Sequence, residues 1–85
     1  MTKLTDIAVY LVDAVKHRKS AHDPLYLGKH VARRLELTSS EMETLLMAIV
    51  MEKAYGSDEE GVQGARDALE RDSRDYRCIQ EVLQH

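Results

Sequence analysis

Three of the four histidines, His17, His22 and His30, lie close together in the chain. Imidazole nitrogens bind zinc, and a helix that holds zinc through two histidines places them four residues apart. These histidines are separated by five and eight residues, and the single cysteine, Cys78, has no second thiol to act with it. We therefore expect no metal site and no cofactor.

The nucleophilic side chains also lack the partners that catalysis needs. A reactive thiol requires a base within hydrogen-bonding reach, and no such order of residues surrounds Cys78. The chain has no glycine-rich loop for phosphate, and its serines occur where helices are expected to begin or where the chain turns. The sequence predicts a protein that is not an enzyme and has no catalytic residues. The serines at the expected helix starts and turns are Ser39, Ser40, Ser57 and Ser73.

Charge is distributed unevenly along the chain, although the net charge is only −3. The segment from Lys16 to Arg34 contains six Lys or Arg residues and one acid, so its net charge is +5. The remaining 66 residues contain six basic and fourteen acidic residues, a net charge of −8. Such segregation indicates a basic surface for an anionic partner, or a match between the basic and acidic parts within or between subunits. A solvated basic face is the remaining interpretation.

The basic segment contains a clear helix signal. Asp23 can cap a helix and Pro24 is tolerated at its first position, so a helix is predicted from Pro24 to about Leu37. Leu27 and Val31 belong to an apolar side that repeats every four residues. The opposite side is polar and mostly basic, and we expect it to bind a protein partner with an acidic surface. This basic arc comprises Lys29, His30, Arg33 and Arg34.

Residues 28–46, GKHVARRLELTSSEMETLL, resemble a helix-turn-helix motif over about a quarter of the chain. Ala32 occupies the position where the motif has a small residue, and Leu35 and Leu37 bracket the turn. Met42 lies where the second helix packs against the first. The resemblance implies a nucleic-acid-binding transcriptional regulator that acts through residues 24–55.

The resemblance departs from the motif at the positions that would meet DNA. Glu36 stands at the turn position that is usually glycine, where a left-handed backbone is needed. Glu41 and Glu43 would face a polyanion at the start of the second helix, which offers no Arg, Lys, Asn or Gln to a base edge. Nucleic-acid binding is therefore our second hypothesis, after binding to a protein.

A third helix is predicted at about residues 40–55, opened by a capping box in which Ser40 caps and Glu43 returns the hydrogen bond. Its apolar residues occupy every side, so it must be surrounded by its own chain or by a second subunit. The other helices of so short a chain would struggle to enclose it alone. We therefore expect a homodimer, with an interface at Met47, Val50 and Met51.

Two further helices are expected before and after these. The first begins near Thr2 or Thr5, either of which could cap it, and runs to about Lys19. The fourth follows a second capping box between Ser57 and Glu60.

Beyond that fourth helix a continuous helix would put Asp72 in the middle of the apolar stripe. A break is therefore predicted at Asp72 and Ser73, with a fifth helix from about Arg74 to Leu83; a single bent helix is the alternative.

Length and composition restrict the number of domains and the fold class. Eighty-five residues predict one helical domain, 1–85, and 44% hydrophobic with 32% charged residues is typical of a globular chain. We predict an all-α fold, a compact bundle of four to five short helices around an apolar central helix at about residues 40–55. No segment approaches the roughly 18 apolar residues of a membrane span. Asp6 and Asp13 argue against a signal peptide, and one cysteine suits a reducing compartment.

These observations together predict a small cytoplasmic regulatory or adaptor module, without enzyme activity, that acts by protein–protein interaction as a homodimer.

Overall fold

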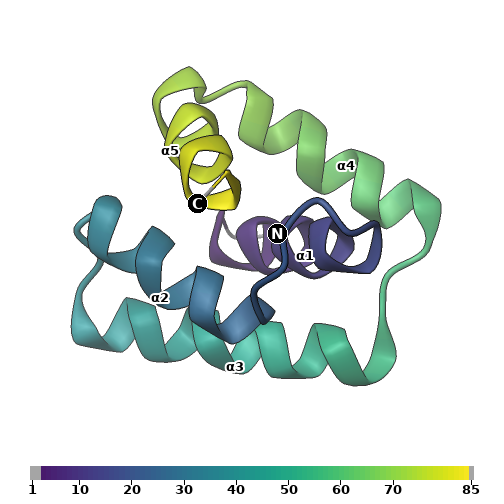
Figure 1. Ribbon diagram of the computed structural model, residues 1–85, viewed down its shortest axis with the longest axis horizontal. Helices are drawn as coiled ribbons and strands as arrows, with labels where there is room; N and C mark the ends of the chain where they lie inside the picture. The colour runs from purple at the N-terminus through teal and green to yellow at the C-terminus, as the bar shows by residue number, and fades with distance from the viewer. Residues whose placement is uncertain (1–2, 85) are drawn as a thin grey trace.

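The computed structural model describes residues 3–84, which form five helices and no strand. The predicted all-α bundle is confirmed, and its helices enclose one shared apolar core (Figure 1). The helices are α1 (Lys3–Lys16), α2 (Pro24–Arg34), α3 (Ser39–Tyr55), α4 (Glu59–Glu70) and α5 (Ser73–Leu83).

The central helix of the bundle is α1, and the prediction that residues 40–55 occupy this place is corrected. Figure 1 shows α1 nearly end-on in the middle, with α3 below it and α4 above it. Eight residues of α1 are buried, including every residue from Asp6 to Val12. In α3 only Leu45 and Ile49 are buried, because one side of this helix packs against α1 and α2 and the other side faces solvent.

Fully buried side chains from four helices meet in the core. Leu11 of α1, Leu27 of α2, Leu45 of α3 and Ile79 of α5 have no exposed surface. The helices α2 and α3 approach each other closely at Gly28, where a Cβ atom would lie 2.5 Å from Cδ1 of Ile49. The glycine that interrupts the apolar side of α2 is therefore the condition for this close contact.

The N-terminal caps follow the sequence, with two shifts of position. Asp23 caps α2 as predicted, since its Oδ1 accepts a hydrogen bond of 2.8 Å from the amide of Leu25. The capping box of α3 is formed by Thr38 and Glu41, two residues before the predicted pair. Either pair of residues fits the capping-box motif. A cap at Thr38 has Leu37 directly before it and Met42 four residues after it, and both of these pack against the core.

The start of α4 shows a similar shift. Asp58 rather than Ser57 is the cap, and its Oδ1 accepts a hydrogen bond of 2.7 Å from the amide of Gly61. The hydroxyl of Ser57 instead donates to Glu52 of α3, at 2.9 Å. A break at Asp72 is confirmed, and Asp72 caps α5, so residues 59–83 form two helices.

Two helices end three residues earlier than predicted, and both ends have the same geometry. Arg18 and Glu36 adopt left-handed backbone conformations, with φ of 57° and 56°. The amide after each of them bonds back five residues, from Lys19 to Ala14 and from Leu37 to Ala32. This is the Schellman arrangement, which usually has glycine at the left-handed position. The predicted helix start at Thr2 lies outside the described residues.

Asp6 is a carboxylate in the middle of this packing. It is 7% exposed, and its Oδ1 accepts no hydrogen bond from the described residues. Burial raises the pKa of the Asp6 carboxyl above its ordinary value. The ionised form is therefore less favourable in the folded chain than in the unfolded one, where water solvates it.

We expect Asp6→Asn to raise the melting temperature at pH 7, because the substitution removes a poorly solvated charge and keeps the shape of the side chain. Because the pKa of Asp6 is higher in the folded chain than in the unfolded chain, protonated Asp6 does not destabilise the fold below the unfolded pKa of about 3.9. Ionised Asp6 destabilises the fold increasingly as the pH rises through the folded pKa. The gain should therefore disappear near pH 3. Thermal unfolding followed by circular dichroism at both pH values tests this, with the exposed Asp67→Asn as the control. An equal gain at both pH values would contradict the explanation.

Candidate protein interaction surfaces

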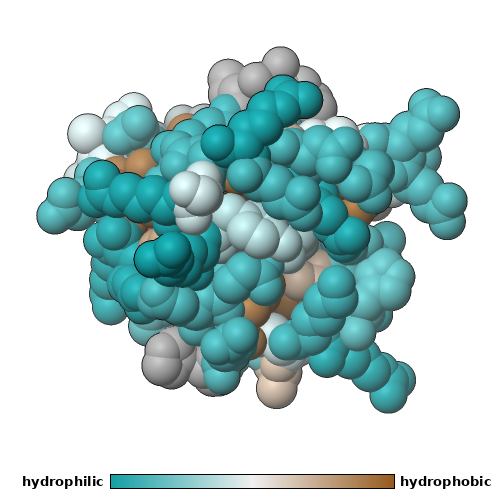
Figure 2. Space-filling model, turned by 90° about the horizontal axis from the view of Figure 1, so that it is seen from above, coloured by the Kyte–Doolittle hydropathy of each residue, from teal (hydrophilic) through white to brown (hydrophobic). Residues whose placement is uncertain are grey.

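The apolar residues that α3 leaves uncovered form one continuous surface. Met47, Val50 and Met51 are 63%, 52% and 56% exposed, and their spacing places them on one side of the helix. We call these three residues the α3 strip. The face formed by α4 and α5 is by contrast predominantly hydrophilic, with only small apolar areas (Figure 2). The residues predicted as a dimer interface are thus available on the surface of one chain.

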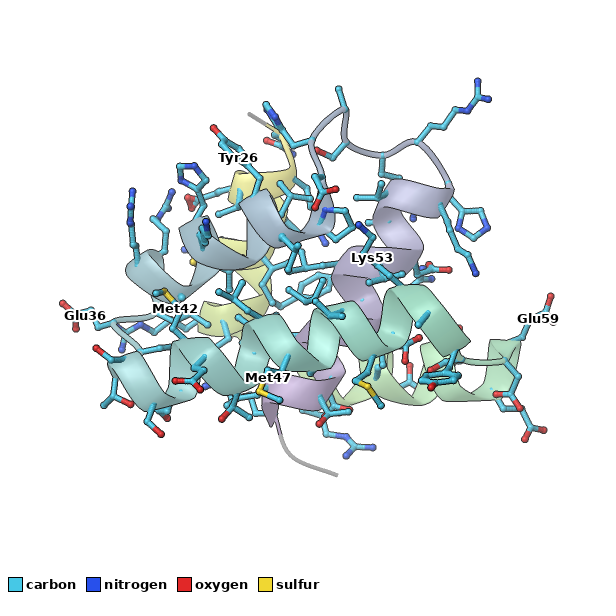
Figure 3. All side chains as sticks on the ribbon, turned by 90° about the horizontal axis from the view of Figure 1, so that it is seen from below. Tyr26, Glu36, Met42, Met47, Lys53 and Glu59 are labelled. Carbon is cyan, nitrogen blue, oxygen red and sulfur yellow. The ribbon has the colours of Figure 1, made fainter. Side chains whose placement is uncertain are left out.

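The α3 strip borders a shallow apolar hollow of about 450 Å³. Figure 3 shows Met42 on the side of α3 next to α2, and Met47 on the side turned away from it. Next along the helix, Tyr55 is 81% exposed and extends the apolar surface toward the C-terminal end of α3. The hollow is lined by Ser39, Met42, Glu43, Leu46, Met47, Val50 and Met51.

The basic arc lies on the exposed side of α2, but its members differ in their surroundings. Lys29 and Arg33 are exposed. Arg34 is engaged with the last helix, since its Nη2 donates to Oε2 of Glu81 at 2.9 Å, and both side chains remain a little under half exposed. His30 is half-buried against the ring of Tyr26. The structure thus brings the four predicted residues to one surface and adds an acid from α5.

An aromatic ladder runs along the same surface. The rings of His22, Tyr26 and His30 follow one another at four-residue intervals, with 4.4 Å between successive ring centroids. Arg34 continues the same spacing. The interval of four residues between these rings is visible in the sequence, so the ladder was predictable from spacing alone.

A second hollow, of about 330 Å³, lies where α2 meets α5. Its lining consists of Tyr26, His30, Arg34 and Val82. Two of these residues belong to the predicted basic arc, whereas Val82 joins them only through the packing of α5 on α2. No spacing in the sequence could have placed Val82 at this surface.

Part of the charge segregation is matched within the chain. Lys53 of α3 pairs with Asp23 of the basic segment at 3.3 Å. With the pair between Arg34 and Glu81, both parts of the chain thus supply partners to each other. Lys29 and Arg33 have no ion pair among residues 3–84, so they are the cations of the basic arc most available to another molecule.

The histidines and the cysteine do not converge. Within residues 3–84, no three His, Cys, Asp or Glu side chains form a group that could hold a metal ion. Cys78 is half-buried on α5, and burial raises the pKa of its thiol, which disfavours the reactive thiolate. None of the helices over these residues is long and apolar enough to cross a membrane.

Comparisons of the chain with protein-family models, with curated proteins and with solved structures find no match. The exposed surfaces of α2 and α3 are therefore the features from which a function can be inferred.

Proposed function

We propose that this chain is a small regulatory or adaptor module in the cytoplasm, without enzyme activity, that forms a homodimer and binds an acidic protein partner. The observation that carries the proposal is the exposed α3 strip. A bundle of this size has few apolar residues to spare, yet Met47, Val50 and Met51 lie outside the core. Contiguous apolar surface of this kind is characteristic of interfaces between proteins.

Pairing with a second copy is the simplest way to cover the α3 strip. A two-fold axis perpendicular to α3 would place the same strip of two chains face to face, with the two helices antiparallel. The three residues recur at intervals of three and four, which is the pattern by which helices pack against each other. Methionine side chains adapt their shape to an opposing surface, so two of them near the axis would suit a self-complementary contact.

The basic arc would remain free in such a dimer for a different partner. The basic arc and the α3 strip are both exposed, but they belong to different helices, α2 and α3. Lys29 and Arg33 are not needed to bury the apolar side of α2, and their like charges add no stability to the isolated helix. An acidic protein surface could pair with Lys29 and Arg33 without touching the acidic parts of this chain.

We expect the unmodified chain to be a dimer at micromolar concentration, and Met47→Asp to weaken the dimer by at least about tenfold in Kd, because a carboxylate would be desolvated in an apolar interface. Light scattering coupled to size-exclusion chromatography measures the mass, and circular dichroism verifies that helix content is kept. Ser73→Asp is the matched control, since it adds the same charge at an exposed position of α5, which does not contact α3 within the described residues.

A monomeric mass for the unmodified chain would refute the homodimer. An equal effect of Met47→Asp and Ser73→Asp would show that the dimer forms through some surface other than the α3 strip.

Nucleic-acid binding remains the second candidate because one observation favours it. The turn between α2 and α3 contains a left-handed residue at Glu36, where a helix-turn-helix motif requires this conformation. The exposed residues at the start of α3 include Glu41 and Glu43, however, and these would repel phosphate. Fluorescence anisotropy with random-sequence duplex DNA at low and moderate salt tests this candidate, which requires binding that weakens as salt rises.

A further inference from the structure

The hollow between α2 and α5 combines apolar and aromatic lining with one cation, Arg34. Val82 of α5 forms part of the lining and is 4% exposed, so it offers a buried apolar contact at the base. Tyr26 and His30 supply the ring surfaces of one wall, and the Arg34 guanidinium lies beside them. A volume of about 330 Å³ is at the lower end for sites that bind small molecules, and it suits one large side chain.

We propose that this hollow is the anchor point for the acidic partner: it takes one aromatic side chain of an acidic peptide segment, and a carboxylate of that segment replaces Glu81 on Arg34. This inference deepens the proposed function and rests on its claim that the basic arc binds an acidic protein.

The charges around the hollow select an acidic segment. Lys29 and Arg33 are exposed on the same side of α2, so several carboxylates in one segment can reach cations at once. Their attraction acts over distance and raises the rate of encounter. An aromatic side chain adds the buried contact that charge alone lacks, and tyrosine and arginine are the residue types that dominate such contacts.

Glu81 occupies the position at Arg34 that the partner's carboxylate would take. The pair is geometrically sound, at 2.9 Å, but both side chains are about 45% exposed. Ion pairs with this exposure contribute little to stability, so a competing carboxylate that brings other contacts can displace Glu81. The chain thus contains its own competitor for the site. Removal of Glu81 should strengthen partner binding, and removal of Arg34 should weaken it.

A peptide fits these surroundings better than a nucleic acid does. Glu36 follows the basic arc at the end of α2 and Glu81 borders the hollow, so a long polyanion along α2 would meet carboxylates at both places. A short acidic segment can end before it reaches Glu36. The aromatic ladder is compatible with stacking of bases, and nucleic acid is for this reason an outcome that the experiment must separate.

The test uses the full chain and a fluorescein-labelled probe peptide with three Glu or Asp residues on each side of one tryptophan, measured by fluorescence anisotropy at low salt. We expect Glu81→Gln to bind the peptide about threefold more tightly, and Arg34→Gln and Tyr26→Ala to bind it about tenfold more weakly. Glu70→Gln and Arg71→Gln are the matched controls, since they remove the same charges from exposed positions of α4 and its end. Tyr26→Phe should retain binding because it keeps the ring.

Three results would overturn the inference. A peptide with alanine in place of tryptophan could bind as well as the probe, which would show that the hollow is not used. Glu81→Gln could fail to strengthen binding beyond its control, which would show that Glu81 is no competitor. A ten-nucleotide single-stranded DNA could bind more tightly than the peptide and displace it, which would assign the surface to nucleic acid.

The result of the peptide experiment does not depend on whether the chain is a homodimer. A monomeric chain that shows the expected peptide results keeps the anchor point and loses the α3 interface. A dimeric chain that shows none of them keeps the interface and loses the anchor point.

Discussion

Leu11→Ala should lower the free energy of unfolding by about 3 kcal/mol, the cost of a cavity at a fully buried leucine. Leu11 has no exposed surface and lies in α1, which packs against α2, α3 and α4. A loss of this size is a large fraction of the 5–10 kcal/mol or so that a small domain has in total. Urea unfolding followed by circular dichroism measures it, at several protein concentrations so that any contribution of a dimer is recognised.

The comparison for this prediction is Leu35→Ala at the end of α2. Leu35 packs against the core but is only partly buried, so its truncation should cost about 1 kcal/mol. Equal losses from the two substitutions would contradict the conclusion that α1 is the centre of the core.

The second large effect concerns two glycines that should respond in opposite directions. Gly28→Ala places a methyl group 2.5 Å from Cδ1 of Ile49, a fully buried side chain that can shift only by displacing its neighbours in the core. The overpacking should cost more than the roughly 1 kcal/mol that alanine gains over glycine in a helix, for a net loss of about 1–2 kcal/mol. Gly64 has no atom within 4 Å of such a methyl group, so Gly64→Ala should stabilise by about 0.5–1 kcal/mol.

A double-mutant cycle shows whether the predicted clash is the cause. Ile49→Val removes the Cδ1 atom, and alone it should cost about 1 kcal/mol. Combined with Gly28→Ala it should cost less than the sum of the two single losses, because the added methyl group then has room. If both glycine substitutions stabilise the protein, the contact between α2 and α3 adjusts freely and the explanation fails.

The helices were predictable because their boundaries depend on neighbours in the sequence. The cap at Asp23 and the break at Asp72 are formed by residues within three positions of each other, and both were predicted. The early ends at Arg18 and Glu36 were harder to place, because no glycine marks the left-handed residue in either case. Glu36 was recognised only through its position in the helix-turn-helix resemblance.

The place of each helix in the bundle was less predictable, because periodicity does not say what covers an apolar side. The apolar residues of α3 predicted burial on every side, but Met47 and Met51 face solvent in one chain. The candidate site shows the same limit. The cations of the basic arc were predicted from α2 alone. The pairing of Arg34 with Glu81 joins residues 47 positions apart, so no local sequence pattern predicts it.

The position of α1 also affects how the chain can fold during its synthesis. The central helix is made before α3 and α4, against which it packs, and the last residue of α4 is Glu70. The apolar surface of α1 therefore has no complete cover until α4 has left the ribosome. We expect nascent chains that stop before α4 to bind chaperones, and native structure to form only after α4 has emerged.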